Sequence, residues 1–124
     1  MTLARAGHPE QYLITASGTE ELRPQGPIVG IRGDLAYDEE VRSFNEGDVL
    51  FLYTDGLFNL ISAHQEKVTG LPEFDEAPHL VRAFGDITDE STPAEACDAI
   101  LRRFQKGYDD VDDDITVIVV KRVQ

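Results

Sequence analysis

Residues 50–57 read Leu50-Phe51-Leu52-Tyr53-Thr54-Asp55-Gly56-Leu57, a short apolar segment that ends abruptly at a carboxylate followed by glycine. With Val49 in front of it, this run is typical of a central strand that is covered on both faces. A carboxylate at the end of a buried strand is costly unless a cation or a hydrogen-bond donor lies beside it. The segment therefore predicts the middle strand of a sheet. It also makes Asp55 a candidate functional residue, with Gly56 letting the chain turn away beside it.

A second acidic cluster opens directly into another strand. The run Asp109–Asp114 holds five carboxylates in six positions and leads into the apolar segment Ile115–Val120. Two strand-end acids that meet in space form half of a site for a hard cation, because magnesium and manganese prefer oxygen ligands. Thr116 follows the cluster and could hydrogen-bond a neighbouring carboxylate. A turn that begins a helix and a solvated acidic loop are the ordinary alternatives, and each segment taken singly leaves them open.

The composition fits one domain. The chain has 124 residues and a net charge of −13. This charge argues against nucleic acid and anionic membranes as partners, because both are polyanions. No apolar run approaches the roughly 20 residues of a membrane span, and no signal peptide is visible. The single Cys97 excludes an internal disulfide and fits a reducing compartment, so we expect a cytoplasmic protein.

Local patterns predict several strands, a helical middle and a final strand. A hairpin is expected from Gln11–Thr15 through a turn to Glu20-Glu21-Leu22, and a tight turn at Asn45–Asp48 precedes the central strand. The other expected elements are a half-exposed strand at Tyr37–Phe44, a short helix or loop at Phe58–Ala63, an irregular stretch at Lys67–Asp75, a short helix at Pro78–Phe84 and a strand at Asp114–Arg122. This order favours an α+β fold with a mainly antiparallel sheet.

The strongest helix signal is the start Ser91-Thr92-Pro93-Ala94-Glu95. Serine or threonine caps the helix, proline suits its first turn, and glutamate complements the helix dipole. Helical spacing continues through Lys106, and Gly107 is expected to close the helix. Cys97 lies inside this amphipathic segment, so we expect a packed thiol and not a nucleophile.

Other residues that could carry chemistry give weaker signals. In Ala6-Gly7-His8-Pro9 a histidine follows glycine, an arrangement that suits a general acid or a ligand, but we interpret His8 as a structural histidine in a turn. The run from Asp109 lacks the glycine and glutamate of an EF-hand loop, which excludes that kind of calcium site. No Ser-His-Asp arrangement, glycine-rich phosphate loop or zinc-ligand spacing is present.

Four segments together resemble a known family. They are Ala4-Arg5-Ala6-Gly7-His8-Pro9, Gly26-Pro27-Ile28-Val29-Gly30, Glu46–Leu57 and Asp113-Asp114-Ile115-Thr116. Their order and spacing are similar to those of the SpoIIE-type (RsbU-like) branch of the protein phosphatase type 2C family, over nearly the whole chain. The pair formed by Tyr53-Thr54-Asp55-Gly56-Leu57 and the Asp-Asp-Ile-Thr motif is the most specific part.

The resemblance implies a serine/threonine phosphatase that uses two manganese or magnesium ions and is built as an α-β-β-α sandwich. Its substrates would be phosphorylated regulators of the anti-anti-sigma type in bacterial signalling. By motif, Asp55 and Asp113 would be metal ligands, and Gly56, Asp114 and Thr116 would lie near the site. A metal-bound hydroxide would attack phosphorus directly, and the resemblance assigns no further catalytic residue in this chain.

This sequence also departs from the family pattern. The first half of the family domain, with the aspartate that bridges the two ions, has no counterpart, and Asn59 stands where relatives often have an acid. We therefore expect residues 1–124 to be a single partial domain, the carboxy-terminal portion of the phosphatase. Two carboxylates without the bridging one would repel each other, so the chain alone is expected to be inactive. Half a sandwich should also expose apolar sheet surface, which invites a homodimer or a missing partner.

Two other functions stay open at this point. A degenerate phosphatase-like module could bind a protein partner without catalysis. A solvated α+β domain with acidic loops and no site is the plainest alternative.

Overall fold

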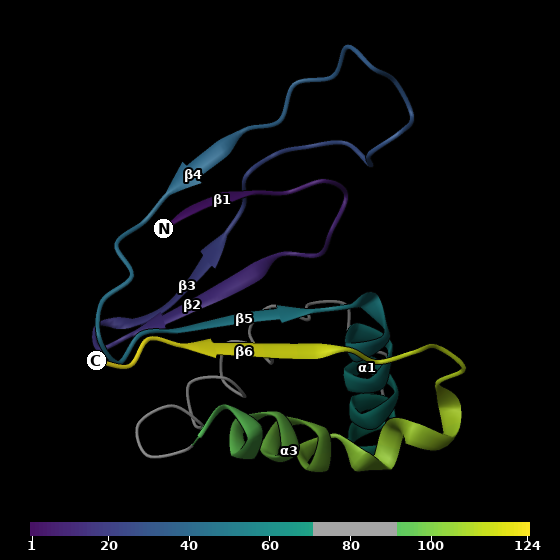
Figure 1. The fold of residues 1–124 in the computed structure, drawn as a ribbon. Coiled ribbons are helices and arrows are strands. Elements are labelled where there is room, and N and C mark those ends of the chain that lie inside the picture. Colours follow the sequence, from purple (N-terminus) through teal and green to yellow (C-terminus); the bar gives the residue numbers. More distant parts are fainter. Residues whose placement is uncertain (71–91) are drawn as a thin grey trace.

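A four-stranded antiparallel sheet forms the centre of the molecule in the computed structural model, which describes residues 1–70 and 92–124 (Figure 1). The strand order is β3-β2-β5-β6, and β1 pairs with β4 in a separate two-stranded sheet. In chain order the elements are β1 Thr2–Ala4, β2 Gln11–Thr15, β3 Gly18–Leu22, β4 Glu39–Val41, β5 Val49–Tyr53, α1 Asp55–Thr69, α3 Pro93–Arg103, the 3-10 helix η1 Gln105–Asp110 and β6 Val117–Lys121. The predicted α+β class and antiparallel sheet are confirmed.

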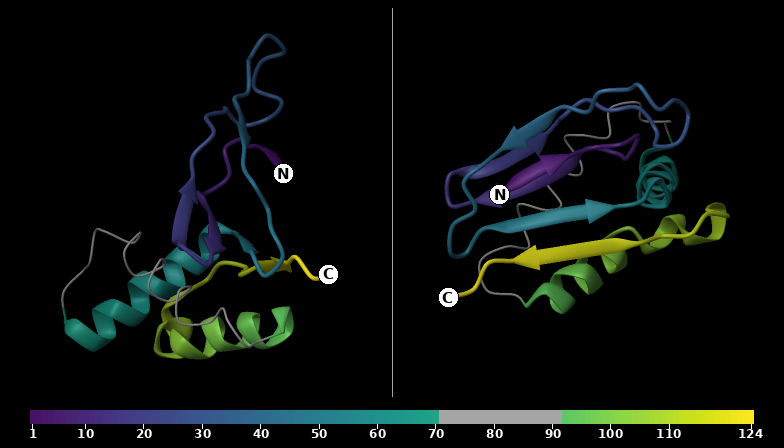
Figure 2. Two further views of the ribbon diagram at one scale, coloured as in Figure 1. Left: turned by 90° about the vertical axis from the view of Figure 1, so that its left-hand side faces the viewer. Right: turned by 45° about the horizontal axis from the view of Figure 1, so that its top comes forward.

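The two faces of the sheet are covered differently. Helices α1 and α3 lie on one face, and β1 and β4 lie on the other side (Figure 2). Alternate residues of β5 point to opposite faces, so Val49, Phe51 and Tyr53 join the core under the helices while Leu50 belongs to the other cluster.

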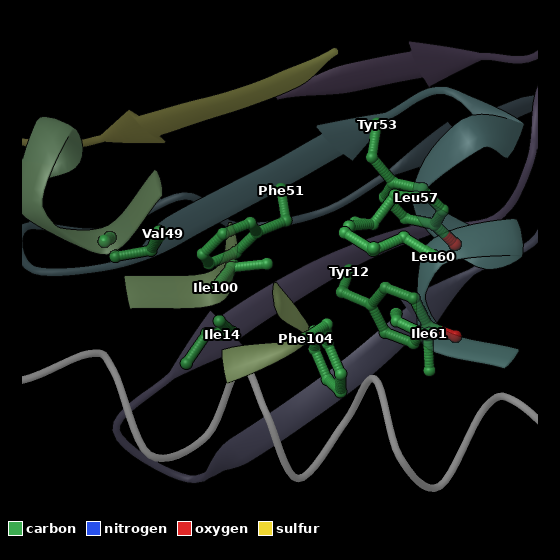
Figure 3. Packing of buried hydrophobic residues seen from close by; sticks show 11 residues of the cluster. Tyr12, Ile14, Val49, Phe51, Tyr53, Leu57, Leu60, Ile61, Ile100 and Phe104 are labelled. Carbon is green, nitrogen blue, oxygen red and sulfur yellow. The ribbon is translucent and has the colours of Figure 1, made fainter. Parts of the chain in front are cut away.

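The main core fills the space between the sheet and the helices. Figure 3 shows side chains from β2, β5, α1 and α3 converging there. Leu60, Ile100 and Phe51 have no exposed surface, and burying each such side chain contributes about 1.5–3 kcal/mol. The buried cluster comprises Tyr12, Ile14, Val49, Phe51, Tyr53, Leu57, Leu60, Ile61, Ala96, Ile100 and Phe104.

The opposite face, called the helix-free face because it carries neither of the described helices α1 and α3, has a smaller core. Leu13, Leu22 and Leu50 are buried there, under partly buried apolar residues that include Met1, Leu3, Phe44 and Leu52. This cover stops short of the edge strand β6, where Ile118 is 50% exposed and Val120 is 41% exposed. Ile118 lies opposite Leu52, and Val120 lies opposite Leu50. An apolar strip therefore remains open along one edge of the sheet.

The predictions of the hairpin, of the tight turn and of the start of α3 are confirmed. The hairpin pairs Gln11 with Leu22, and the tight turn closes with the Asp48 N–H donating to the Asn45 carbonyl at 3.0 Å. Thr92 caps α3 in a capping box, since its hydroxyl accepts from the Glu95 N–H while the Glu95 carboxylate accepts from the Thr92 N–H.

Several predicted boundaries are wrong. Helix α3 ends at Arg103, and Gly107 lies inside η1, buried where that element packs along α1, instead of closing α3. The segment at Phe58–Ala63 is the middle of a 15-residue helix that continues into the stretch predicted to be irregular. Contacts with η1 stabilise the second half of this helix, including the ion pair between Lys67 and Asp110. The His64 ring also meets the ring of Phe104, the residue between α3 and η1, edge-on at 5.4 Å.

The flanking strands are shorter than predicted. Of Tyr37–Phe44 only Glu39–Val41 forms β4, and it pairs with β1, a strand that the sequence patterns did not reveal. The last strand begins at Val117, and the residues before it are irregular, with a bend at Asp113. The predicted helix at Pro78–Phe84 and part of the predicted irregular stretch lie outside the described residues. None of the helices in the described ranges is long and apolar enough to cross a membrane.

Candidate functional site at the end of the central strand

The central strand passes directly into a helix at the predicted acidic position. Thr54 has extended backbone angles and occupies the N-cap of α1, and Asp55 is the first helical residue. The Asp55 side chain is exposed, and a carboxylate at this place interacts favourably with the helix dipole. The ordinary interpretation of Asp-Gly as the start of a helix is therefore correct here, and it leaves the carboxylate available to solvent.

Thr54 joins this turn to the acidic segment that precedes β6. Its N–H donates to the Thr116 carbonyl at 3.0 Å. Its hydroxyl donates to the Asp114 carbonyl at 3.2 Å and accepts from the Thr116 N–H at 2.9 Å. These three hydrogen bonds extend the β5–β6 pairing past Tyr53 and Val117, the last pair of the ladder. The turn after β5 and the turn before β6 therefore lie side by side.

Gly56 allows the two turns to approach closely. It is buried, and a Cβ atom on it would lie 2.4 Å from the Asp114 carbonyl oxygen. No side chain fits in that space without separating the segments. Gly56 is thus required by the contact with Asp114.

The acidic segment before β6 is exposed and bends at Asp113. The Asp114 N–H donates to Asp113 Oδ1 at 2.9 Å, and Asp113, Asp114 and Thr116 are all exposed. The contacts of Thr116 with the Asp55 turn run through its backbone, whereas the sequence suggested a hydrogen bond to a carboxylate. The five predicted site residues thus lie on two adjoining turns at one end of the sheet.

The acidic run is divided between two places. Asp109 and Asp110 end η1, and Asp110 Oδ2 pairs with Lys67 Nζ on α1 at 2.5 Å. This hydrogen bond raises the pKa of Lys67. The first two acids therefore belong to the contact between α1 and η1, and only the later ones border the Asp55 turn.

Two buried tyrosines pack against each other next to the end of β5, just before Asp55. The rings of Tyr12 and Tyr53 stack with centroids 6.2 Å apart, and Phe58 meets Tyr53 edge-on at 5.3 Å. Burial raises the pKa of Tyr12 to about 12, so its hydroxyl stays neutral at physiological pH. The strand end that carries Asp55 is thus fixed by packing.

The donor set suits a hard cation, because it consists of exposed carboxylates next to backbone carbonyls. Within residues 1–70 and 92–124, however, no group of three or more His, Cys, Asp or Glu side chains is arranged to hold a metal ion. The assignment of Asp55 and Asp113 as ligands stays a prediction. Sequence reasoning missed Thr54, whose role depends on partners about sixty residues away; a threonine before a strand-end Asp-Gly was the available signal.

Comparison with known proteins places the chain in a family. The sequence model of the family described as Stage II sporulation protein E (SpoIIE) matches residues 1–123. A search of curated proteins gives no match.

Solved structures share the fold at low sequence identity. The phosphatase domain of the cell fate determinant SpoIIE from Bacillus subtilis, presoaked with manganese, has a TM-score of 0.72 and 15% identity, over 99% of this chain and 50% of that one. A Mycobacterium tuberculosis protein with RsbU and RsbW domains has a TM-score of 0.63 and 23% identity, over 98% and 32% of the two chains. The PPM Ser-Thr phosphatase MsPP from Mycobacterium smegmatis, in complex with cacodylate, has a TM-score of 0.51 and 18% identity, over 99% and 56%.

The matches cover this chain almost completely and the solved structures only in part. The chain spans half the length of the B. subtilis phosphatase domain. The antiparallel sheets and helices described above correspond to part of the phosphatase fold.

Proposed function

This chain belongs to the SpoIIE family, and from that membership we propose that it is part of a metal-dependent serine/threonine protein phosphatase. The observation that carries the proposal is the set of three hydrogen bonds from Thr54, which holds the Asp55 turn against the Asp114–Thr116 segment. Carboxylates from two strands at one sheet end are the arrangement that a hard cation needs.

Asp55 and Asp113 are the residues that would hold manganese or magnesium. A bound ion of this kind polarises a phosphoryl oxygen and activates water. The chain contributes the remaining features: Thr54 fixes the spacing of the two turns, Gly56 permits their approach, and the buried tyrosines keep the strand end in place. The manganese-presoaked B. subtilis relative supports the choice of ion.

The rest of the domain is needed for activity in this proposal. Two carboxylates alone would repel each other and would neutralise a divalent cation incompletely. The described residues provide no third ligand, and the chain spans half of the B. subtilis domain. We therefore propose that residues 1–124 form its carboxy-terminal part and are inactive alone.

The apolar strip on β6 supports the same proposal. Ile118 and Val120 are 50% and 41% exposed on the helix-free face, an unusual exposure for the edge of a completed sheet. The remainder of the domain is the occupant we favour. A homodimer formed through this face is the alternative, and it would give a mass twice that of the chain in solution.

A phosphorylated protein of the anti-anti-sigma type is the proposed substrate. The pairing of an RsbU domain with an RsbW domain in the M. tuberculosis relative supports a protein partner in signalling. A reducing cytoplasm is the proposed location. This fits the free Cys97, whose thiol lies 3.9 Å from the Val117 carbonyl oxygen and whose pKa is raised by burial.

Hydrolysis of p-nitrophenyl phosphate with manganese tests the function. The complete domain is expected to turn over, the 124-residue chain is not, and Asp55→Asn and Asp113→Asn should each lower the rate of the complete domain by about 100-fold or more. Asp110→Asn is the matched control, because this acid pairs with Lys67. Turnover by the chain alone would overturn the requirement for the other half, and an inactive complete domain would refute the phosphatase function.

A second candidate function is a phosphatase-like module that binds a protein without catalysis. The observation that favours it is the lack of a three-ligand group among the described residues. Binding of a phosphoprotein by the complete domain, with no release of phosphate in the presence of manganese, would establish it.

A further inference from the structure

The turn that connects β1 to β2 lies at the same end of the molecule as Asp55. Strands β2 and β5 are antiparallel, with Tyr12 opposite Phe51, so the start of β2 is next to the end of β5. Both the front view and the tilted view show this turn on the side where α1 begins (Figures 1 and 2). The exposed His8 is carried by this turn.

The turn is held in place by several contacts. Arg5, with a side chain only 12% exposed, pairs with Glu10 at 2.8 Å and donates from Nε to the Pro24 carbonyl at 2.9 Å. The Gly7 N–H donates to the Gly26 carbonyl at 3.0 Å. A Cβ atom on Gly26 would lie 1.9 Å from the Arg5 carbonyl oxygen. A connection that only joins two strands does not need these hydrogen bonds and close contacts. The fixed shape of the turn therefore suggests that it positions a residue.

A buried side chain holds the His8 ring from one side. Gln11 is 3% exposed, and its Nε2 lies 2.8 Å from His8 Nδ1 and 2.5 Å from the Pro9 carbonyl oxygen. In this orientation the amide donates both of its hydrogens, and only its oxygen lacks a partner. The reversed amide would place two oxygens 2.5 Å apart and would bury two unused donors, which is more costly.

The orientation of Gln11 decides where the ring proton lies. Nδ1 also lies 3.0 Å from the Pro9 carbonyl oxygen, an acceptor that by itself would favour a hydrogen on Nδ1. Such a hydrogen would also face the Gln11 amide donor, whose Nε2 is 2.8 Å away and which already donates to the Pro9 carbonyl. With the amide in this orientation Nδ1 therefore accepts, and a neutral His8 ring carries its proton on Nε2. The turn therefore presents an N–H donor at a fixed position, from an exposed ring whose other nitrogen is held by a buried group.

We propose that His8 is a substrate-binding residue whose Nε2–H donates a hydrogen bond to a phosphoryl oxygen of the phosphoprotein, with Gln11 as the residue that positions it. This inference rests on the proposed phosphatase function and assigns His8 a role in binding the phosphate at the end of the molecule where Asp55 also lies. A hydrogen bond to a charged oxygen is among the strong ones, so its loss has a measurable effect.

The ring proton is tested directly on the 124-residue chain. Long-range nitrogen–proton spectra at about pH 8 are expected to show His8 with its proton on Nε2. Gln11→Leu is expected to shift the proton toward Nδ1, because the Pro9 carbonyl oxygen is then the remaining partner of that nitrogen. A proton on Nδ1 in the unaltered chain would overturn the proposal.

Kinetics on the complete domain with a phosphoserine peptide tests the role. His8→Gln keeps a donor close to the Nε2 position and should retain kcat/KM within about threefold. His8→Asn places its amide near the Nδ1 position, and His8→Ala has no donor; both should lose about tenfold or more, a range consistent with one charge-assisted hydrogen bond. The melting temperature of His8→Asn should not change, because its amide oxygen can accept the hydrogen bond of Gln11 in place of Nδ1.

The outcomes separate this inference from the function on which it rests. An active wild type with an equally active His8→Asn would overturn the role of His8 and leave the phosphatase function intact. An inactive wild type would refute the proposed function, and this inference with it. An equal loss in His8→Gln and His8→Ala would show that the Nε2 donor is not what matters.

Discussion

The two faces of the four-stranded sheet differ in how completely this chain covers them. Under α1 and α3, Leu60 and Ile100 have no exposed surface. On the opposite face, β1 and its neighbours cover Leu13 and Leu50, but Ile118 and Val120 on β6 stay about half exposed. The apolar core side chains on the helix-covered face are buried, whereas the other face leaves an apolar strip exposed along β6. The difference indicates that the core under the helices contributes most of the stability of this chain, and the candidate site lies at the end of β5 and β6.

The largest expected effect separates the two faces directly. Ile100→Ala should destabilise the chain by about 2–5 kcal/mol, because it removes a fully buried side chain from the main core. Ile118→Ala is the matched control on the open strip and should change the free energy of unfolding by about 0.5 kcal/mol or less. Urea denaturation of both variants measures this difference. Equal losses would mean that the open strip is covered in solution.

The next effect concerns the hydrogen bonds of Thr54 at the end of β5. Thr54→Val keeps the shape of the side chain but leaves the Thr116 N–H and the Asp114 carbonyl without the hydroxyl, so a loss of about 1–2 kcal/mol is expected. Thr54→Ser retains the hydroxyl and should lose less. Hydrogen exchange at the Thr116 amide checks the local effect, and unchanged protection in Thr54→Val would contradict it.

A smaller effect belongs to the helix-covered face alone. Thr92→Ala removes the capping box of α3 and should cost about 1 kcal/mol, measured by thermal unfolding. Thr92→Ser preserves the cap. Because α3 covers only one face, the apolar strip should bind a hydrophobic dye equally in both variants, and increased dye binding in Thr92→Ala alone would argue that the faces are coupled.

The smallest effect is a pH dependence of the stability that comes from the Arg5–Glu10 ion pair, in the turn after β1. The hydrogen bond from Arg5 lowers the pKa of Glu10 from 4.5. A carboxyl whose pKa is lower in the folded state stabilises the protein above the unfolded value and loses that contribution as the pH falls through the folded value. The partly exposed pair should contribute about 0.5 kcal/mol. Glu10→Gln should flatten this part of the stability curve below about pH 5, and an identical curve would contradict the assignment.

The sequence predicts those parts of the molecule whose causes are local. The apolar run Val49–Tyr53, the hairpin and the Thr92 cap each follow from a short pattern, and all are confirmed. The length of α1 was missed because contacts with η1 stabilise its second half. The role of Thr54 was missed because its partners come from a segment about sixty residues away. Motif spacing predicted Asp55 and Asp113 as ligands; the fold brings their segments together, and their role stays a prediction.

Titration of the nitrogen-labelled chain with manganese tests the central proposal most directly, because a bound paramagnetic ion broadens the amide signals around it. The proposal expects the Gly56 and Asp114 signals to broaden together at the lowest manganese concentration. Asp55→Asn and Asp113→Asn should each abolish both effects, while Asp110→Asn leaves them unchanged. Broadening confined to Asp109 and Asp110, or persisting in both variants, would contradict a shared cation site.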